Sequence, residues 1–174
     1  MSDQELPHEH PILQGLEAIV RSWPGATSEM TINRYKHNTV TLLEARFPPL
    51  PSSTACIDIV GVAGEKAGDG FEIHLSSRET GEVVWFENWE RSMSYFPDGT
   101  RIRSTTDFAE FGCSRIRQLL HSEWKLEVRS GLIFARKTLF RKMEHGWQVD
   151  ERKTWFGSRL VSGYRHRVYL HSPC

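Results

Sequence analysis

GWQVDERKTWFG, residues 146–157, is the stretch that decides the fold of the C-terminal part of the chain. Residues 144–146 read as a tight turn, so the segment that follows is predicted to be the return strand of a β-hairpin. Side chains of a strand alternate between two faces. The more apolar face of this strand would carry Trp147, Val149, Glu151, Lys153 and Trp155. The strand therefore places a glutamate and a lysine between two tryptophans, on the side expected to face the core.

The segment before the turn, residues 131–146, is ambiguous, because its apolar residues fit a helical arc nearly as well as a strand. We interpret it as the first strand of the hairpin, since a turn and a clear return strand follow it. Further strands are predicted over residues 29–35, 38–47, 55–62, 71–77, 83–96, 124–130 and 164–171.

Two helices complete the predicted fold. The first covers residues 10–23, with helically spaced apolar positions at Ile12, Leu13, Leu16, Ile19, Val20 and Trp23. The second covers residues 108–123 and begins after a capping box formed by Asp107 and Glu110. The sequence thus predicts an α+β fold, predominantly antiparallel β-sheet with an N-terminal helix and one central helix. We expect residues 1–9 to be a flexible tail and residues 10–174 to form a single domain.

Composition narrows the class of protein. The chain has 174 residues, 39% hydrophobic and 25% charged, which is ordinary for a globular domain. No apolar run approaches the ~20 residues of a membrane span, and the polar N-terminus is not a secretory signal. The cysteines, Cys56, Cys113 and Cys174, are odd in number and lack metal spacing, and the glycine-rich residues 61–70 lack P-loop spacing. We expect a cytoplasmic protein with no membrane partner, no metal and no cofactor.

Charge is distributed unevenly along the chain. Residues 1–100 contain 7 Lys and Arg against 15 Asp and Glu, a net −8, and residues 101–174 contain 15 against 7, a net +8. A basic half is compatible with a nucleic-acid face. No helix-turn-helix, zinc-finger or RNA-binding signature accompanies it. We therefore favour an interpretation in which the two halves pack together and neutralise each other, and nucleic acid is not the expected partner.

A second strand breaks the usual pattern in the same way. The face of residues 83–96 that holds the aromatic side chains carries Val83, Trp85, Glu87, Trp89, Arg91, Met93 and Tyr95. His166 likewise shares a face with Tyr164, Val168 and Leu170. An uncompensated charge in an apolar interior costs several kcal/mol, so these charges must be paired, exposed in a cavity, or paired with a ligand.

These pattern breaks predict an aromatic-lined cavity with a few convergent polar groups, the usual form of a small-molecule site. The candidate catalytic residues are Glu151 and Glu87, each able to act as an acid or a base. The candidate ligand-binding residues are Arg91, Lys153, His166, Trp85, Trp89, Trp147 and Trp155. A structural alternative stays open: a β-bulge would shift the face by one residue, and long charged stems can cover aromatic surface on a solvent-exposed face.

The order of elements resembles that of the chorismate lyase-like group, which includes chorismate pyruvate-lyase and the ligand-binding domains of some bacterial repressors. SRIRQLLHSEWKLEVRS, residues 114–130, is similar to its helix-then-strand segment, and residues 135–156 to its closing hairpin. The resemblance implies an active-site role for Glu151. The family's carboxylate-holding arginine has no match in residues 71–77, where Glu72 and His74 stand, and Arg91 on the next strand is the substitute.

We therefore expect a protein that binds or transforms a small anionic, aromatic molecule in the aromatic-lined cavity. If it is an enzyme, a lyase or proton-transfer reaction is expected rather than hydrolysis, because the sequence shows no nucleophile–base motif. The alternative is a non-catalytic interaction protein whose basic C-terminal half contacts an acidic protein or nucleic acid. The sequence carries no signal for an oligomeric state.

Overall fold

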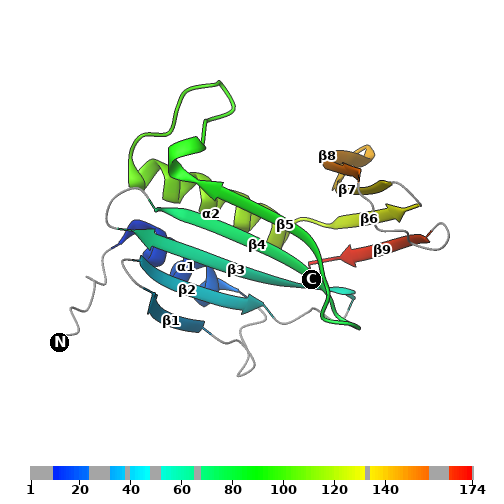
Figure 1. The fold of residues 1–174 in the computed structure, drawn as a ribbon, viewed down its shortest axis with the longest axis horizontal. Coiled ribbons are helices and arrows are strands. Elements are labelled where there is room, and N and C mark those ends of the chain that lie inside the picture. The colour runs from blue at the N-terminus through cyan, green and yellow to red at the C-terminus, as the bar shows by residue number, and fades with distance from the viewer. Residues whose placement is uncertain are drawn as a thin grey trace. The chain divides into compact units, whose positions relative to one another are not determined.

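The computed structural model of the chain describes residues 10–23, 32–37, 40–47, 52–64, 68–131, 134–156 and 165–173. The predicted tail, residues 1–9, lies outside the described residues. Two helices and nine strands are described, with one 3-10 turn (Figure 1). In chain order they are α1 (Pro11–Ser22), β1 (Ile32–His37), β2 (Val40–Phe47), β3 (Ala55–Gly64), β4 (Gly70–Ser77), β5 (Val83–Glu90), η1 (Arg91–Met93), α2 (Thr105–His121), β6 (Trp124–Ser130), β7 (Phe134–Met143), β8 (Gly146–Phe156) and β9 (Arg165–His171).

The strands form two sheets. One has five strands in the order β1-β2-β3-β4-β5, and the other has four in the order β8-β7-β6-β9. The pairs β1–β2, β2–β3, β6–β7, β6–β9 and β7–β8 are all antiparallel. The predicted α+β class, with mostly antiparallel sheet, an N-terminal helix and a central helix, is confirmed. The ambiguous segment before the hairpin turn is the strand β7, as predicted.

The chain divides into two compact units. Unit 1 takes its described residues from the segments Met1–Pro48, Ile57–His74 and Phe86–Gln118. Unit 2 takes its described residues from Pro49–Cys56, Leu75–Trp85 and Leu119–Cys174. The candidate sites described below each lie within one unit.

The core of unit 1 is formed where the two helices cover the large sheet. All six apolar positions predicted for the first helix are buried. A Cβ at Gly15 of α1 would lie 2.5 Å from the Cys113 Sγ of α2, and one at Gly112 would overlap the Phe71 ring of β4. These glycines let backbone and neighbouring side chains approach closely. Burial raises the pKa of the Cys113 thiol to about 11, so this side chain is a protonated core residue at neutral pH.

Helix α2 begins three residues earlier than predicted. Ser104 is its cap, because the Asp107 backbone N–H donates a hydrogen bond to Ser104 Oγ over 3.0 Å. The capping box assigned to Asp107 and Glu110 was therefore wrong. Strand β5 also ends earlier than predicted, at Glu90, and Arg91 begins the turn η1.

The core face of the small sheet shows where the two charged residues of the hairpin strand lie. Trp124, Leu126, Leu139, Tyr169 and His171 are buried there. Glu151 lies opposite Leu139, and Lys153 lies opposite Lys137, so both charges are on this inward face, as predicted.

A β-bulge in β8, where Asp150 is the extra residue opposite the step from Leu139 to Phe140, changes the face of the β8 residues nearer the turn. Beyond it Val149 lies opposite Phe140, and Trp147 lies opposite Lys142. Phe140 in turn pairs with Lys125 on the outward face of the sheet. Trp147 therefore does not share a face with Glu151, and the strict alternation predicted for the whole strand was wrong, because one inserted residue reverses the face of everything beyond it.

Candidate functional site

The predicted tryptophan cluster is divided between two sheets. Trp85 and Trp89 belong to β5, at the edge of the large sheet, whereas Trp147 and Trp155 belong to β8, at the edge of the small one. Period-two indexing defines the faces of a strand but not the sheet that the strand joins, so it did not show that these four candidates belong to two different sheets. Trp89 packs edge-on against Phe111, with ring centroids 6.2 Å apart.

Glu87 is buried as predicted, and another side chain of the same unit pairs with it. Its carboxylate is 3.1 Å from Arg115 Nη2 through Oε1 and 3.3 Å from Arg115 Nε through Oε2. Arg115 also donates to Gln118 Oε1 over 2.9 Å. The two contacts between Arg115 and the Glu87 carboxylate have the geometry of a strong ion pair. The charge of Glu87, which interrupts the aromatic face of β5, is therefore paired with Arg115 of α2.

Arg91 has an internal carboxylate to bind. Its Nε donates to Asp69 Oδ2 over 2.8 Å, and its Nη1 donates to the Arg103 carbonyl over 2.9 Å. The buried Asp69 also accepts a hydrogen bond from Thr105 Oγ1 over 2.9 Å. Arg91, the first residue of η1, thus links Asp69 before β4 to Arg103 in the loop before α2, and it also lines a pocket of about 370 Å³ with Arg101 and Arg103.

The charges of the hairpin strand contact an aromatic ring within unit 2. Lys153 Nζ lies 4.4 Å from the centroid of the Trp85 ring, and 3.4 Å from Glu151 Oε1. A cation over a tryptophan face is attracted by the negative face of the ring. Three of the predicted site residues are therefore brought together here: Trp85, Glu151 and Lys153. Burial lowers the pKa of the neighbouring Lys137, and the positive charge of Lys153 lowers it further.

His166 and Trp147 lie on the outward face of the small sheet. His166 Nε2 is 3.7 Å from Glu127 Oε2, and Lys125 Nζ is 5.3 Å from the centroid of the Trp147 ring. The long lysine stem thus covers part of the exposed ring. These two residues therefore fit the alternative in which charged stems cover aromatic surface on a solvent-exposed face, and they do not form a cavity wall.

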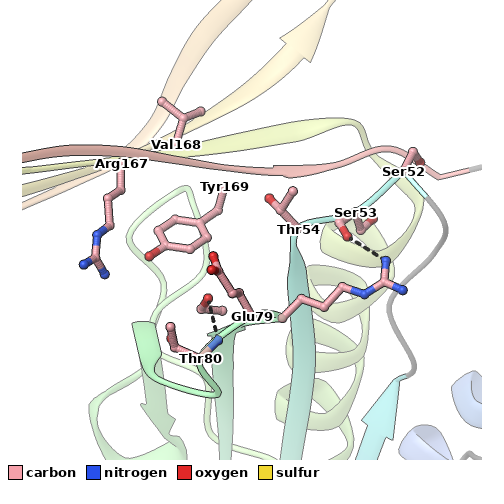
Figure 2. A pocket seen from close by; sticks show the side chains of 10 residues that line it. Ser52, Ser53, Thr54, Glu79, Thr80, Arg167, Val168 and Tyr169 are labelled. Carbon is pink, nitrogen blue, oxygen red and sulfur yellow. Dashed lines mark hydrogen bonds between the residues drawn. The ribbon is translucent and has the colours of Figure 1, made fainter.

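A pocket of about 830 Å³ lies elsewhere in unit 2 (Figure 2). Its lining comes from the segment before β3, from the turn after β4, and from β9. The lining residues are Ser52, Ser53, Thr54, Ser77, Arg78, Glu79, Thr80, Arg167, Val168 and Tyr169. In Figure 2 Arg167 and Tyr169 project from β9 toward the turn, whereas Val168 points the other way. Six of the ten residues carry a hydroxyl and two carry a guanidinium.

Three hydroxyl oxygens of the pocket accept backbone hydrogen bonds. Thr54 Oγ1 accepts from the Leu170 N–H over 2.9 Å, and Ser77 Oγ accepts from the Thr80 N–H over 3.3 Å. Thr80 Oγ1 accepts from the Glu82 N–H over 3.3 Å. A hydroxyl that accepts in this way keeps its hydrogen for donation. The pocket is consequently rich in donors.

The two arginines of the pocket differ in their contacts. Arg78 Nη1 donates to the Ser53 carbonyl over 3.4 Å, which holds this guanidinium beside the Ser53 backbone. Arg167 is exposed, and its Nη1 is 3.6 Å from Glu82 Oε2. A side-chain hydrogen bond with Tyr169 raises the pKa of Arg167, so the group is fully charged at neutral pH.

Sequence reasoning missed this pocket. Its residues come from three segments of ordinary composition, and the pattern break noted in β9 concerned His166, which does not line the pocket. The available signal was the cluster PSST, residues 51–54, and the acidic-basic turn at residues 78–80. Nothing in the sequence placed these segments beside β9.

Comparison of the chain with protein-family models, with curated proteins and with solved structures gave no match. Within the described ranges, no group of three or more His, Cys, Asp or Glu side chains is placed to hold a metal ion. None of the described helices has the length and apolar character needed to cross a membrane.

Proposed function

We propose that the protein binds a small anionic molecule in the pocket of unit 2. The observation that carries this proposal is a space of about 830 Å³ whose lining includes two guanidinium groups and several hydroxyl donors. Pockets of 300 to about 1,000 Å³ are typical of small-molecule sites. Guanidinium groups bind carboxylates through two parallel hydrogen bonds.

Glu79 limits which anions fit. Its carboxylate lines the same pocket and would repel a ligand with a second negative charge, whereas it can accept a hydrogen bond from a ligand hydroxyl. Tyr169 is mostly buried and offers a ring to an apolar part of the ligand. We therefore propose a hydroxylated aromatic monocarboxylate as the ligand class, with its carboxylate at Arg167.

Calorimetric titration with benzoate, 4-hydroxybenzoate and the neutral benzamide tests the proposal. Benzoate should bind more tightly than benzamide, and Arg167→Met should weaken benzoate binding about 10- to 100-fold, as expected for a lost charged hydrogen bond. The matched control is Arg152→Met, which removes an exposed arginine of the same unit outside the pocket. Equal binding of benzoate and benzamide, or an equal loss in the control, refutes the proposal.

A second candidate function rests on the outward face of the small sheet. Arg129 of β6 lies directly opposite Arg136 of β7, and like charges in that position destabilise a sheet. An acidic protein surface docked on this face would relieve the repulsion. This function predicts a salt-sensitive complex with an acidic protein that Arg136→Glu abolishes while benzoate binding stays unchanged. Binding of nucleic acid in place of protein would contradict it.

A further inference from the structure

Ser53, which lines the pocket, contacts His171, which is 118 positions away in the chain and lies behind the lining; both side chains are buried. Ser53 Oγ is 3.2 Å from His171 Nδ1, and His171 Nε2 is 3.0 Å from the Leu120 carbonyl oxygen. A carbonyl oxygen only accepts hydrogen bonds, so Nε2 must carry the ring hydrogen of the neutral imidazole. Nδ1 is then the basic nitrogen, and the Ser53 hydroxyl donates to it. The two contacts assign the tautomer that a general base requires.

Besides the Ser53 hydroxyl, two groups hold the imidazole ring in place: the Leu120 carbonyl and the Trp124 ring. Leu120 lies in the last turn of α2, where the helix dipole favours a positive charge such as the imidazolium that forms during proton transfer. The Trp124 ring stacks on the imidazole, with centroids 5.1 Å apart and an interplanar angle of 18°. Burial lowers the pKa of His171, and the nearby His121 lowers it further, so the ring is neutral at pH 7 and Nδ1 is free of a proton.

We propose that Ser53 and His171 are a nucleophile–base pair for acyl transfer, acting on a small ester that carries a negative charge. The arrangement has the diagnostic features of an activated nucleophile: a hydroxyl within hydrogen-bonding distance of a base, and a third group that orients the base. Because the charged end of the ester would be held by Arg167, the substrate class rests on the proposed function of the pocket.

The reaction requires only the ester and water. Ser53 Oγ forms a bond to the acyl carbon while its proton passes to His171 Nδ1. Arg78 donates to the Ser53 carbonyl over 3.4 Å, and in this reaction its guanidinium would supply the positive charge for the oxyanion. The C–O bond of the ester then breaks, and the leaving alcohol takes the proton from Nδ1. Water attacks the acyl-serine with His171 again as base, and this step releases the acid and restores the Ser53 hydroxyl.

The first experiment treats the folded protein with a small fluorophosphonate, a reagent that phosphonylates activated serines with loss of fluoride. Peptide mapping by mass spectrometry should place one phosphonyl group per chain on Ser53. The same reagent should not label Ser53 in protein unfolded with urea. Labelling of several serines to a similar extent, or no labelling of Ser53 in the folded protein, overturns the proposal.

The second experiment measures hydrolysis of mono-(4-nitrophenyl) succinate and of the neutral 4-nitrophenyl acetate. Ser53→Ala should abolish turnover of both, and His171→Asn should lower it about 10²- to 10⁴-fold, the usual contribution of a general base. The control is Ser94→Ala, because Ser94 is also buried, donates to the Glu90 carbonyl over 2.7 Å and lies outside the pocket. Full activity of Ser53→Ala overturns the proposal.

The two proposals fail in different ways. If Ser53 is not labelled but benzoate still binds and depends on Arg167, the pocket stands and the nucleophile–base pair is refuted. If Ser53 is labelled but Arg167→Met leaves the preference for the anionic ester unchanged, the pair stands and the anion site is refuted.

Discussion

Replacing Glu87 by methionine should destabilise the protein by about 3 kcal/mol or more, the cost of leaving a partly buried charge without its partner. Glu87 is 4% exposed, and its carboxylate meets two nitrogens of Arg115 at 3.1 and 3.3 Å. Arg115→Met should cost at least as much, because it leaves the more deeply buried carboxylate unpaired.

The double variant with methionine at both positions should be close to the parent protein in stability. Apolar residues of similar volume often replace a buried ion pair at little cost, because the desolvation penalty of both charges is removed. Urea denaturation of the four proteins gives the coupling free energy, which should approach the sum of the two single losses, about 6 kcal/mol.

A matched pair in the same unit serves as the control. Arg46 Nε is 2.7 Å from Asp58 Oδ1, but the Arg46 side chain is 68% exposed. The same cycle with Arg46→Met and Asp58→Asn should give only about 0.2–1 kcal/mol, as is usual for exposed pairs. A coupling at Glu87 no larger than this would refute the reasoning. It would also return Glu87 to the candidates for a catalytic carboxylate.

Two further predictions concern unit 2. The free energy of unfolding should fall as the pH is lowered below about 6.5. The pKa of His171 is lower in the folded protein than in the unfolded chain, so the unfolded chain takes up a proton first. Thermal melts at decreasing pH should therefore show the melting temperatures of the parent and of His171→Asn converging. Glu151→Gln should change stability by less than about 1 kcal/mol, since the Glu151–Lys153 pair at 3.4 Å is partly exposed. A loss of stability above about 2 kcal/mol would contradict this expectation and show that the pair is a structural anchor.

The sequence by itself determined the identity and order of most elements. The helical spacing in residues 10–23 and the alternation in residues 124–130 depend on one physical rule, that a helix or strand must bury one face. The charge of Glu87 on an aromatic face also predicted its burial correctly. These are local properties, because the residues that decide them are within a few positions of one another.

What the sequence could not decide were the partners. A buried Glu87 requires a positive partner, but only the packing of α2 on the sheet determines that this partner is Arg115. Arg91 binds the carboxylate of Asp69, which the sequence did not indicate. The bulge at Asp150 places Trp147 on the outward face, because an inserted residue breaks the alternation of a strand, and its position is fixed only when the strands pair.

The pocket and the Ser53–His171 pair belong wholly to the tertiary structure. The sequence showed no nucleophile–base motif, since the two residues are 118 positions apart and each is unremarkable in its own segment. They meet because β9 pairs with β6 and brings His171 opposite Trp124, while the Thr54 backbone N–H bonds to the Leu170 carbonyl over 3.0 Å. Periodicity tells which face of an element is buried, but long-range hydrogen bonding between strands determines what that face meets.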